Sequence, residues 1–141
     1  GTYRPEPTLE SLLSDPPRLA RLFKELFDGA SARAAGGGGL HTGALVDDGR
    51  IVDVVEDVSR SAVIDKLVGC AWLGGGVPEQ SLLLLSGRIS ASIAVKLAAA
   101  GIAAAATISI PTTLAVDIAS QAGVALVGRS RRDHPYRYGT G

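Results

Sequence analysis

Cysteine and methionine are scarce in this 141-residue chain, which has one cysteine and no methionine. A single cysteine, Cys70, excludes an internal disulfide bond and a zinc site built from cysteines. Lysine and arginine total 14 residues, as do aspartate and glutamate, so the formal net charge is zero. The chain therefore lacks the broad positive field that nucleic-acid-binding proteins use, and we expect no nucleic-acid partner.

Long apolar runs are also missing. The most apolar stretches are Leu82 to Leu85 and 97–110, which Gly101 interrupts, and neither approaches the roughly 18 residues that cross a bilayer. The first 25 residues are charged and carry several prolines, unlike a signal peptide. We therefore expect a cytoplasmic protein with no membrane partner. Because the chain begins at Gly1 and not at methionine, we expect a trimmed chain or part of a longer product.

Apolar residues make up 46% of the chain, which suits one domain with a single buried core. We divide the chain into an N-terminal helical segment at 1–28, an α/β core domain at 29–129 and a C-terminal tail at 130–141. The tail is polar and shows no periodic pattern.

The N-terminal segment predicts two helices. Thr8 is positioned to cap a short helical turn at 9–13, and Asp15 precedes Pro16 as the N-cap of a longer helix. The apolar stripe of that helix comprises Leu19, Leu22, Phe23, Leu26 and Phe27. We expect the helix to end at Asp28-Gly29, followed by a linker of small residues at 29–39.

The core domain predicts a hairpin followed by alternating helices and strands. Strand-like runs at 40–46 and 51–55 flank an Asp-Gly pair, Asp48-Gly49, which is typical of a tight β-turn. The further expected elements are a helix from near Ser59, a loop at 74–78, strands at 81–85, 102–108 and 124–128, and helices at 91–100 and 112–122. Short strand–helix–strand connections favour right-handed crossovers and parallel strands. The expected fold is an α/β three-layer sandwich whose mixed sheet has an antiparallel hairpin and a parallel section.

Two strand-to-helix turns share one design. The strands at 81–85 and 102–108 each run into hydroxyl-bearing residues at a helix N-terminus, where free N–H groups favour an anion. The residues concerned are Ser86, Gly87, Arg88 and Ser90 in the first turn, and Ser109, Pro111, Thr112 and Thr113 in the second. Arg88 could add a bidentate phosphate contact. Alternatively, Ser90, Ser109 and Thr112 only cap helices, and Pro111 only fixes an entry angle.

A third candidate segment contains Asp57 and Arg60, followed in the next helix by Asp65 and Lys66. Either these residues contact a ligand, or Asp57 or Ser59 caps the helix and Asp65 and Lys66 form a solvated pair. His41 follows four glycines, which permit close approach of a ligand to the backbone, although a lone histidine there also suits a structural role. The pattern predicts no catalytic residue and no metal ligand.

These segments resemble the motifs of the formate dehydrogenase accessory protein family, FdhD/NarQ. The resembling stretches, from about Phe27 to Gly128, are Gly38 to Ala44, Glu56 to Arg60 with Asp65-Lys66, Ser86 to Ser90, Ser109 to Val116 and Leu126 to Gly128. Four motifs and a matching last strand, in the correct order and spacing, make this resemblance specific.

The resemblance implies a fold similar to that of cytidine deaminases. It also implies sulfur transfer from a cysteine desulfurase to the molybdenum cofactor of formate dehydrogenase, so both enzymes become expected partners. The implied cofactor is molybdopterin guanine dinucleotide or a guanine nucleotide, with no metal bound directly by the protein. The implied ligand contacts are His41, Asp57, Arg60, Asp65, Lys66 and the two turns. An exposed hairpin edge and an apolar N-terminal helix are compatible with a homodimer.

The chain also departs from the family pattern. The family's Cys-x-x-Cys loop aligns near Gly1 to Arg4, where there is no cysteine, and a sulfur relay needs a thiolate. Ser59 replaces a family glycine, Ser61-Ala62 replaces a histidine-asparagine pair, and Ser92 replaces an acid. Whether the chain is an enzyme therefore stays open. The alternative function is a non-catalytic scaffold or regulatory relative that has lost sulfur transfer.

A third hypothesis is an unrelated enzyme on the same fold, such as a deaminase. It would need a bound metal, for which the only nitrogen or sulfur ligands in the chain are His41, His134 and Cys70.

Overall fold

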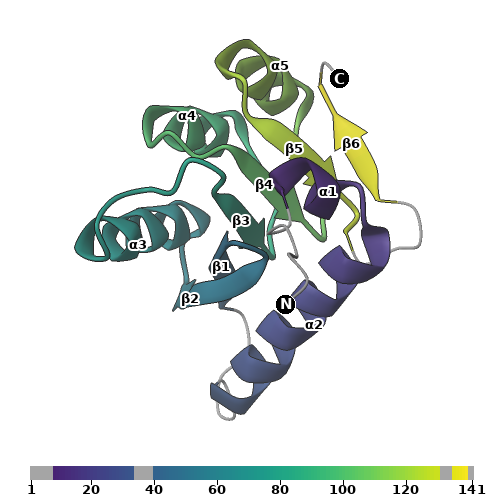
Figure 1. The fold of residues 1–141 in the computed structure, drawn as a ribbon. Helices are drawn as coiled ribbons and strands as arrows, with labels where there is room; N and C mark the ends of the chain where they lie inside the picture. Colours follow the sequence, from purple (N-terminus) through teal and green to yellow (C-terminus); the bar gives the residue numbers. More distant parts are fainter. Residues whose placement is uncertain (1–7, 34–39, 131–134, 140–141) are drawn as a thin grey trace, which may run out of the picture.

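A computed structural model of the chain describes residues 8–33, 40–130 and 135–139 (Figure 1). In these residues the elements are α1 (Leu9–Leu13), α2 (Pro16–Arg33), β1 (His41–Asp47), β2 (Arg50–Asp57), α3 (Arg60–Leu73), β3 (Leu82–Leu85), α4 (Ala91–Ala99), β4 (Ala104–Thr107), α5 (Thr113–Ala122), β5 (Ala125–Gly128) and β6 (Tyr136–Tyr138).

The six strands form one mixed sheet in the order β2-β1-β3-β4-β5-β6. The hairpin strand β1 pairs antiparallel with β2 and with β3, whereas β3, β4 and β5 are parallel. The predicted combination of an antiparallel hairpin with a parallel section is confirmed. Asp48 and Gly49 connect the hairpin with φ values of 51° and 75°, the left-handed pair that a tight primed turn requires.

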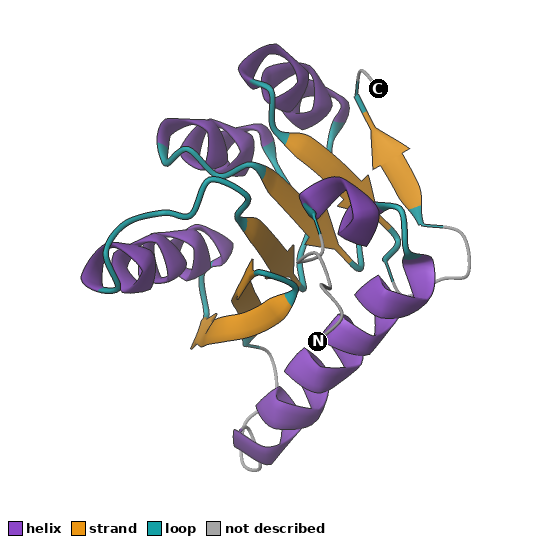
Figure 2. Cartoon of the chain, viewed as in Figure 1, coloured by secondary structure: helices purple, strands orange, loops and turns teal. Residues whose placement is uncertain are grey.

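Helices cover both faces of the sheet, which makes three layers (Figures 1 and 2). Helices α3, α4 and α5 pack on one face, and α1 and α2 pack on the other. Because both faces are covered, β3 is apolar throughout, β4 is apolar up to its last residue, Thr107, and neither strand alternates with polar residues. Leu82 and Leu84 of β3 face α2, while Leu83 and Leu85 face α3 to α5, and all four are buried.

The long helix α2 follows its predicted start but not its predicted end. The Asp15 carboxylate accepts a hydrogen bond from the N–H of Arg18 at 3.2 Å, and the apolar stripe around Phe23 is buried. The helix continues to Arg33, so the prediction that it ends at Asp28-Gly29 is wrong. A glycine inside a helix lowers helix stability by only about 1 kcal/mol relative to alanine. The residues after Gly29 are compatible with a helix, so the helix continues through it. The rest of the predicted linker, 34–39, lies outside the described residues.

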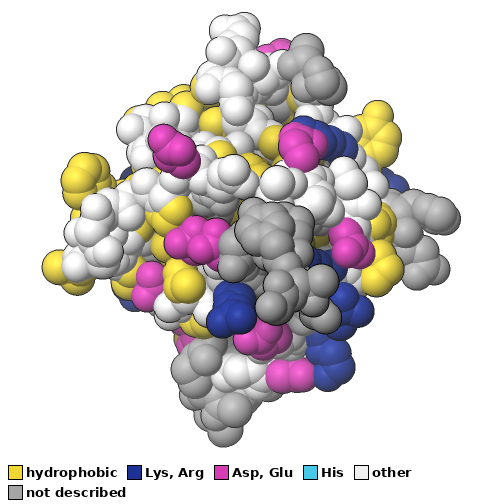
Figure 3. All heavy atoms as spheres, viewed as in Figure 1, with side chains coloured by type: hydrophobic (Ala, Val, Ile, Leu, Met, Phe, Trp, Pro, Cys, Tyr) yellow, Lys and Arg dark blue, Asp and Glu magenta, His cyan; other side chains and the backbone are white. Residues whose placement is uncertain are grey.

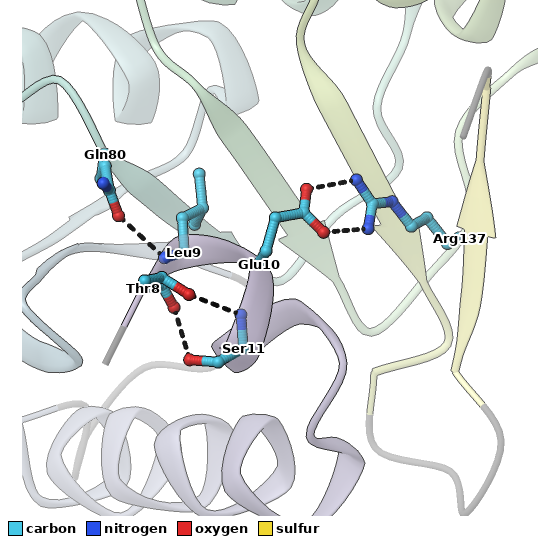
Figure 4. Close-up of polar contacts among 6 residues, drawn as sticks. All are labelled: Thr8, Leu9, Glu10, Ser11, Gln80 and Arg137. Atoms are coloured by element: carbon cyan, nitrogen blue, oxygen red, sulfur yellow. Dashed lines mark hydrogen bonds and ion pairs between the residues drawn. The ribbon is translucent and has the colours of Figure 1, made fainter. Parts of the chain in front are cut away.

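The C-terminal tail contains a strand that its sequence did not predict. Strand β6 pairs antiparallel with β5, and three residues are too few to show a periodic pattern. Arg137 in this strand makes two 2.8 Å hydrogen bonds to the Glu10 carboxylate of α1 (Figure 4). These bonds and the Arg137 charge lower the pKa of Glu10. The pair thus ties the first helix to the last strand.

The short helix α1 begins as predicted. The Thr8 hydroxyl oxygen accepts a hydrogen bond from the N–H of Ser11 at 3.1 Å, and the Gln80 side chain accepts one from the N–H of Leu9 at 2.9 Å (Figure 4). The second bond connects α1 to the loop before β3.

Charged side chains of both signs are interspersed on the face shown in Figure 3. Of the helices within the described residues, none combines the length and hydropathy required to cross a bilayer.

Gly43 in the middle of β1 permits close packing of α3 on the sheet. A Cβ atom at this position would lie 2.5 Å from Cγ1 of Val63 and 3.0 Å from Cδ1 of Leu67. Both of these side chains are buried, with 2% and 1% of their surface exposed. Gly69 on α3 is the opposite case, because a Cβ atom added there would meet nothing within 4 Å.

We expect Gly43→Ala to lower the free energy of unfolding by about 1–3 kcal/mol, since the added methyl group overpacks a filled core. Urea denaturation followed by circular dichroism measures this change. The matched control, Gly69→Ala, is expected to raise the free energy of unfolding by about 0.5–1 kcal/mol through helix propensity. Equal stability of Gly43→Ala and the wild type would contradict the packing described for α3.

Candidate ligand-binding site at the carboxyl edge of the sheet

The two predicted strand-to-helix turns lie side by side. Strands β3 and β4 are parallel neighbours with Leu85 opposite Thr107, so the turns that follow them leave the sheet at the same edge. Ile89 of the first turn bridges to Pro111 of the second. The N–H of Ile89 donates to the Ile110 carbonyl at 3.3 Å, and the N–H of Thr112 donates to the Ile89 carbonyl at 3.0 Å. The bridge and these two hydrogen bonds therefore hold the two turns side by side.

Two of the hydroxyl groups in these turns cap helices. The Ser90 oxygen accepts a hydrogen bond from the N–H of Ile93 at 3.4 Å, and the Thr112 oxygen accepts one from the N–H of Ala115 at 3.1 Å. Each cap accepts a hydrogen bond from one N–H group of the first helical turn. The other N–H groups of that turn have no partner within the helix and lie at this edge of the sheet. Ser109 precedes the cap by three residues, so the interpretation of Ser109 as a cap is wrong.

Thr107, the last residue of β4, connects the two turns through its side chain. Its hydroxyl group donates to the Gly87 carbonyl at 2.6 Å and accepts from the N–H of Ser109 at 3.1 Å. Thr107 is fully buried. Sequence reasoning missed it, although it is the one polar residue of an otherwise apolar strand, and that pattern was a usable signal.

Cationic side chains gather beside the first turn. His41, Arg60, Gly87 and Arg88 line a shallow hollow with a volume of only about 10 Å³, together with four apolar residues, Val63, Ile64, Leu85 and Ile93. Because β1 is antiparallel to β3, the start of β1 brings His41 to the carboxyl edge of β3. The Arg60 guanidinium donates to the Arg88 carbonyl at 3.4 Å. The hollow thus has a basic rim and an apolar floor.

The side chain of Arg60 lies against Gly87, in the space that a side chain at position 87 would occupy. A Cβ atom on Gly87 would lie 2.9 Å from Cδ of Arg60 and 3.4 Å from Nδ1 of His41. The hydroxyl oxygen of the preceding Ser86 accepts a hydrogen bond from the N–H of Thr42 at 2.9 Å, which fixes the first turn to β1. A small residue at position 87 therefore lets His41 of β1 and Arg60 of α3 approach the turn.

Asp57 and Lys66 form an ion pair at the start of α3, with a 2.9 Å separation between the ammonium nitrogen and the carboxylate. Lys66 also donates to the Glu56 carbonyl at 2.9 Å, and Asp57 accepts from the N–H of Ser59 at 2.9 Å. The hydrogen bond from Lys66, followed by that from Ser59, lowers the pKa of Asp57. Ser59 itself is the N-cap of α3.

Asp65 does not join this group. Its carboxylate pairs with Lys96 of α4 at 2.7 Å, while Lys66 pairs with Asp57, so the prediction of an Asp65–Lys66 pair is wrong. The two residues are sequence neighbours on a helix and face different directions. Thr113, the remaining candidate, lies exposed at the start of α5.

The third parallel strand also ends at this edge. The N–H of Arg129, which follows β5, donates to the Ser109 carbonyl at 2.9 Å. Arg129 is exposed and has a φ value of 53°. In the described part of the chain, no group of three or more histidine, cysteine, aspartate or glutamate residues is arranged to hold a metal ion.

Fold and site together define an α/β sandwich protein with a basic, anion-compatible hollow at the carboxyl edge of its parallel strands. The profile of the FdhD/NarQ family matches residues 2–140. The chain belongs to the FdhD/NarQ family, which confirms the resemblance seen in its motifs.

Individual relatives agree with this assignment. The chain is 44% identical over 119 residues to "Sulfur carrier protein FdhD" of Streptomyces coelicolor, a match that covers 83% of this chain and 40% of that protein. It is 39% identical over 126 residues to the protein of the same name from Burkholderia mallei, covering 89% of this chain and 46% of the relative. The chain thus spans less than half the length of these curated relatives.

A solved structure supports the fold. The crystal structure of a formate dehydrogenase accessory protein from Desulfotalea psychrophila superposes with a TM-score of 0.79 at 23% sequence identity. The match covers 89% of this chain and 56% of the other. The predicted α/β sandwich with a mixed sheet is confirmed.

We expect Lys66→Met to raise the pKa of Asp57 toward the ordinary aspartate value, because the main cause of its lowering is removed. A carboxyl group whose pKa is lowered in the folded state stabilises that state above its unfolded pKa, and this contribution disappears as the pH falls through the folded pKa. The wild type is therefore expected to have a larger free energy of unfolding than the variant at neutral pH, and this difference is expected to vanish in strong acid.

Carboxyl-carbon NMR titration of Asp57 measures this shift. Lys96→Met, which removes the partner of Asp65 instead, serves as the control and leaves the Asp57 titration unchanged. An identical Asp57 pKa in wild type and Lys66→Met would show that the ion pair is absent in solution.

Proposed function

We propose that this chain is the cofactor-binding core of a formate dehydrogenase accessory protein. It binds molybdopterin guanine dinucleotide, or a guanine nucleotide, in the hollow beside the β3–α4 turn and serves the sulfuration and maturation of formate dehydrogenase. The observation that carries this proposal is that Arg60, Arg88 and His41 line one hollow beside the β3–α4 turn, which the Ile89–Pro111 bridge joins to the β4–α5 turn. The names of the relatives, sulfur carrier and formate dehydrogenase accessory protein, support the same role.

The residues at the rim of the hollow suit a phosphate-bearing ligand. The exposed Arg88 guanidinium, which has no hydrogen-bond partner among the described residues, offers two donors to a phosphate group. The first-turn N–H groups of α4 and α5 offer further donors, and the helix dipoles favour negative charge there. Asp57, Lys66 and Asp65 then act through their ion pairs by holding α3 in place.

The chain's own cysteine does not belong to this site. Cys70 lies ten residues after Arg60 on α3, which is about 15 Å along the helix axis. We therefore assign ligand binding, and not the sulfur-carrying step, to the residues of this chain. The proposed partners are formate dehydrogenase and a cysteine desulfurase, and the proposed compartment is the cytoplasm, where disulfide bonds are rare.

A second candidate function is a scaffold or regulatory relative that has lost ligand binding. The observation that favours it is the uncharged surface at Ser61, Ala62 and Ser92, where the family carries a histidine, an asparagine and an acid. In this case the chain forms a stable complex with the desulfurase or the dehydrogenase and binds no guanine nucleotide.

Calorimetric titration with GDP at low and moderate salt tests the proposal. We expect saturable binding that weakens with salt, since counterions compete for the cationic rim. Arg88→Ala is expected to lower the binding free energy by about 1.5–3 kcal/mol, the usual value for a charge-assisted hydrogen bond. The control is Arg50→Ala, because Arg50 is an exposed arginine at the opposite end of the hairpin.

The outcomes separate the two functions. Equal affinity of Arg88→Ala and wild type would place the ligand elsewhere on the molecule. Absence of binding at millimolar GDP, together with a stable pull-down of the dehydrogenase or the desulfurase, would favour the scaffold.

A further inference from the structure

A buried hydroxyl group joins the two turns of the proposed site. Thr107 is fully buried, and its side chain is the link between the Gly87 carbonyl and the N–H of Ser109, at 2.6 and 3.1 Å. Neither the cation of the first turn, Arg88, nor the cap of the second, Thr112, is touched by this hydroxyl in the contacts of the described residues. Thr107 therefore contacts both turns from the interior of the protein, where a ligand does not reach it.

The same two strands carry a comparable link at their other end. Ser81, which precedes β3 and is fully buried, accepts a hydrogen bond from the N–H of Ala103 at 3.1 Å. Its carbonyl also accepts from the N–H of Ala104 at 3.1 Å. Both hydroxyl groups thus bridge β3 and β4, one at the ligand edge and the other at the amino edge.

Only the link at the ligand edge controls groups that face the proposed ligand. Gly87 lies between Ser86 and Arg88 and lines the hollow, and Ser109 begins the turn that leads to Thr112. The Thr107 hydroxyl both donates and accepts, so it fixes the orientation of a peptide group in each turn. Without it, the carbonyl of one turn and the N–H of the other lose their partner, and the spacing of the turns is less restricted.

We propose that Thr107 is a positioning residue for ligand binding: its hydroxyl group holds the Arg88 turn and the Pro111 turn at a fixed spacing, so that one anionic ligand contacts both. This inference rests on the proposed function, since it concerns the same hollow. The physical effect is preorganisation, because turns that are already aligned need not be ordered when the ligand binds. Thr107 contributes to affinity without touching the ligand.

The test compares Thr107→Val, Thr107→Ser and Ser81→Ala with the wild type. Valine has nearly the shape of threonine but lacks the hydroxyl group, whereas serine keeps it and lacks the methyl group. We expect Thr107→Val to raise the dissociation constant for GDP about tenfold, equal to about 1.4 kcal/mol. The dissociation constant of Thr107→Ser for GDP is expected to lie within about twofold of the wild-type value, because serine keeps the hydroxyl group.

Ser81→Ala separates positioning from stability. It removes a buried hydrogen bond between the same two strands, so its midpoint of urea denaturation is expected to fall about as far as that of Thr107→Val. Its affinity for GDP is expected to stay at the wild-type value. Amide hydrogen exchange at Ser109, measured by NMR, is expected to rise in Thr107→Val alone, because only that variant removes the acceptor.

Three outcomes would overturn the inference. Wild-type affinity in Thr107→Val would show that the turns need no alignment, while loss of binding in Arg88→Ala would leave the proposed site intact. Equal weakening in Ser81→Ala would reduce the effect to general stability. Failure of the wild-type protein to bind GDP would remove the proposed function, and this inference with it.

Discussion

The parallel pairing of β3 with β4 is the constraint on which the rest of the molecule depends. Four buried leucines in β3 and three buried alanines in β4 place these strands between two helical layers, and the single polar side chain of the two strands, Thr107, stands at the end of β4. All chemistry is therefore confined to the ends of the strands. At the carboxyl end, two turns leave in the same direction and bring Arg88, Pro111 and the helix N-termini to one edge.

Local sequence signals were sufficient for most of the fold. The Asp48-Gly49 turn, the caps at Ser59, Ser90 and Thr112, and the apolar periods specify their elements because each acts within a few residues. The errors concern features that depend on distant partners. Strand β6 forms because it pairs with β5. Helix α2 continues past Gly29 because the free energy that this glycine costs is smaller than the free energy gained by packing the preceding turns.

The sequence predicted that the two turns meet at one edge of the sheet, and the structure places them there, while ligand binding by their residues stays a prediction. Parallel topology alone brings the two turns together, so their meeting could be inferred from the sequence. Which side chains pair could not, because Asp65 reaches Lys96 of the next helix and Lys66 reaches back to Asp57. Thr107 stands out in the sequence as a polar residue at the end of an apolar strand, but its two partners, the Gly87 carbonyl and the N–H of Ser109, lie on separate turns and could not be named from that pattern.

The ion pair between Glu10 and Arg137 joins residues 127 positions apart in the sequence. It brings the first helix and the last strand together beside the amino ends of β4 and β5, where Ala103, Val124 and Ala125 border a second hollow. The ligand edge lies at the opposite ends of these strands. The contact that joins the first helix to the last strand is therefore made at one end of the strands, and the candidate site lies at the other.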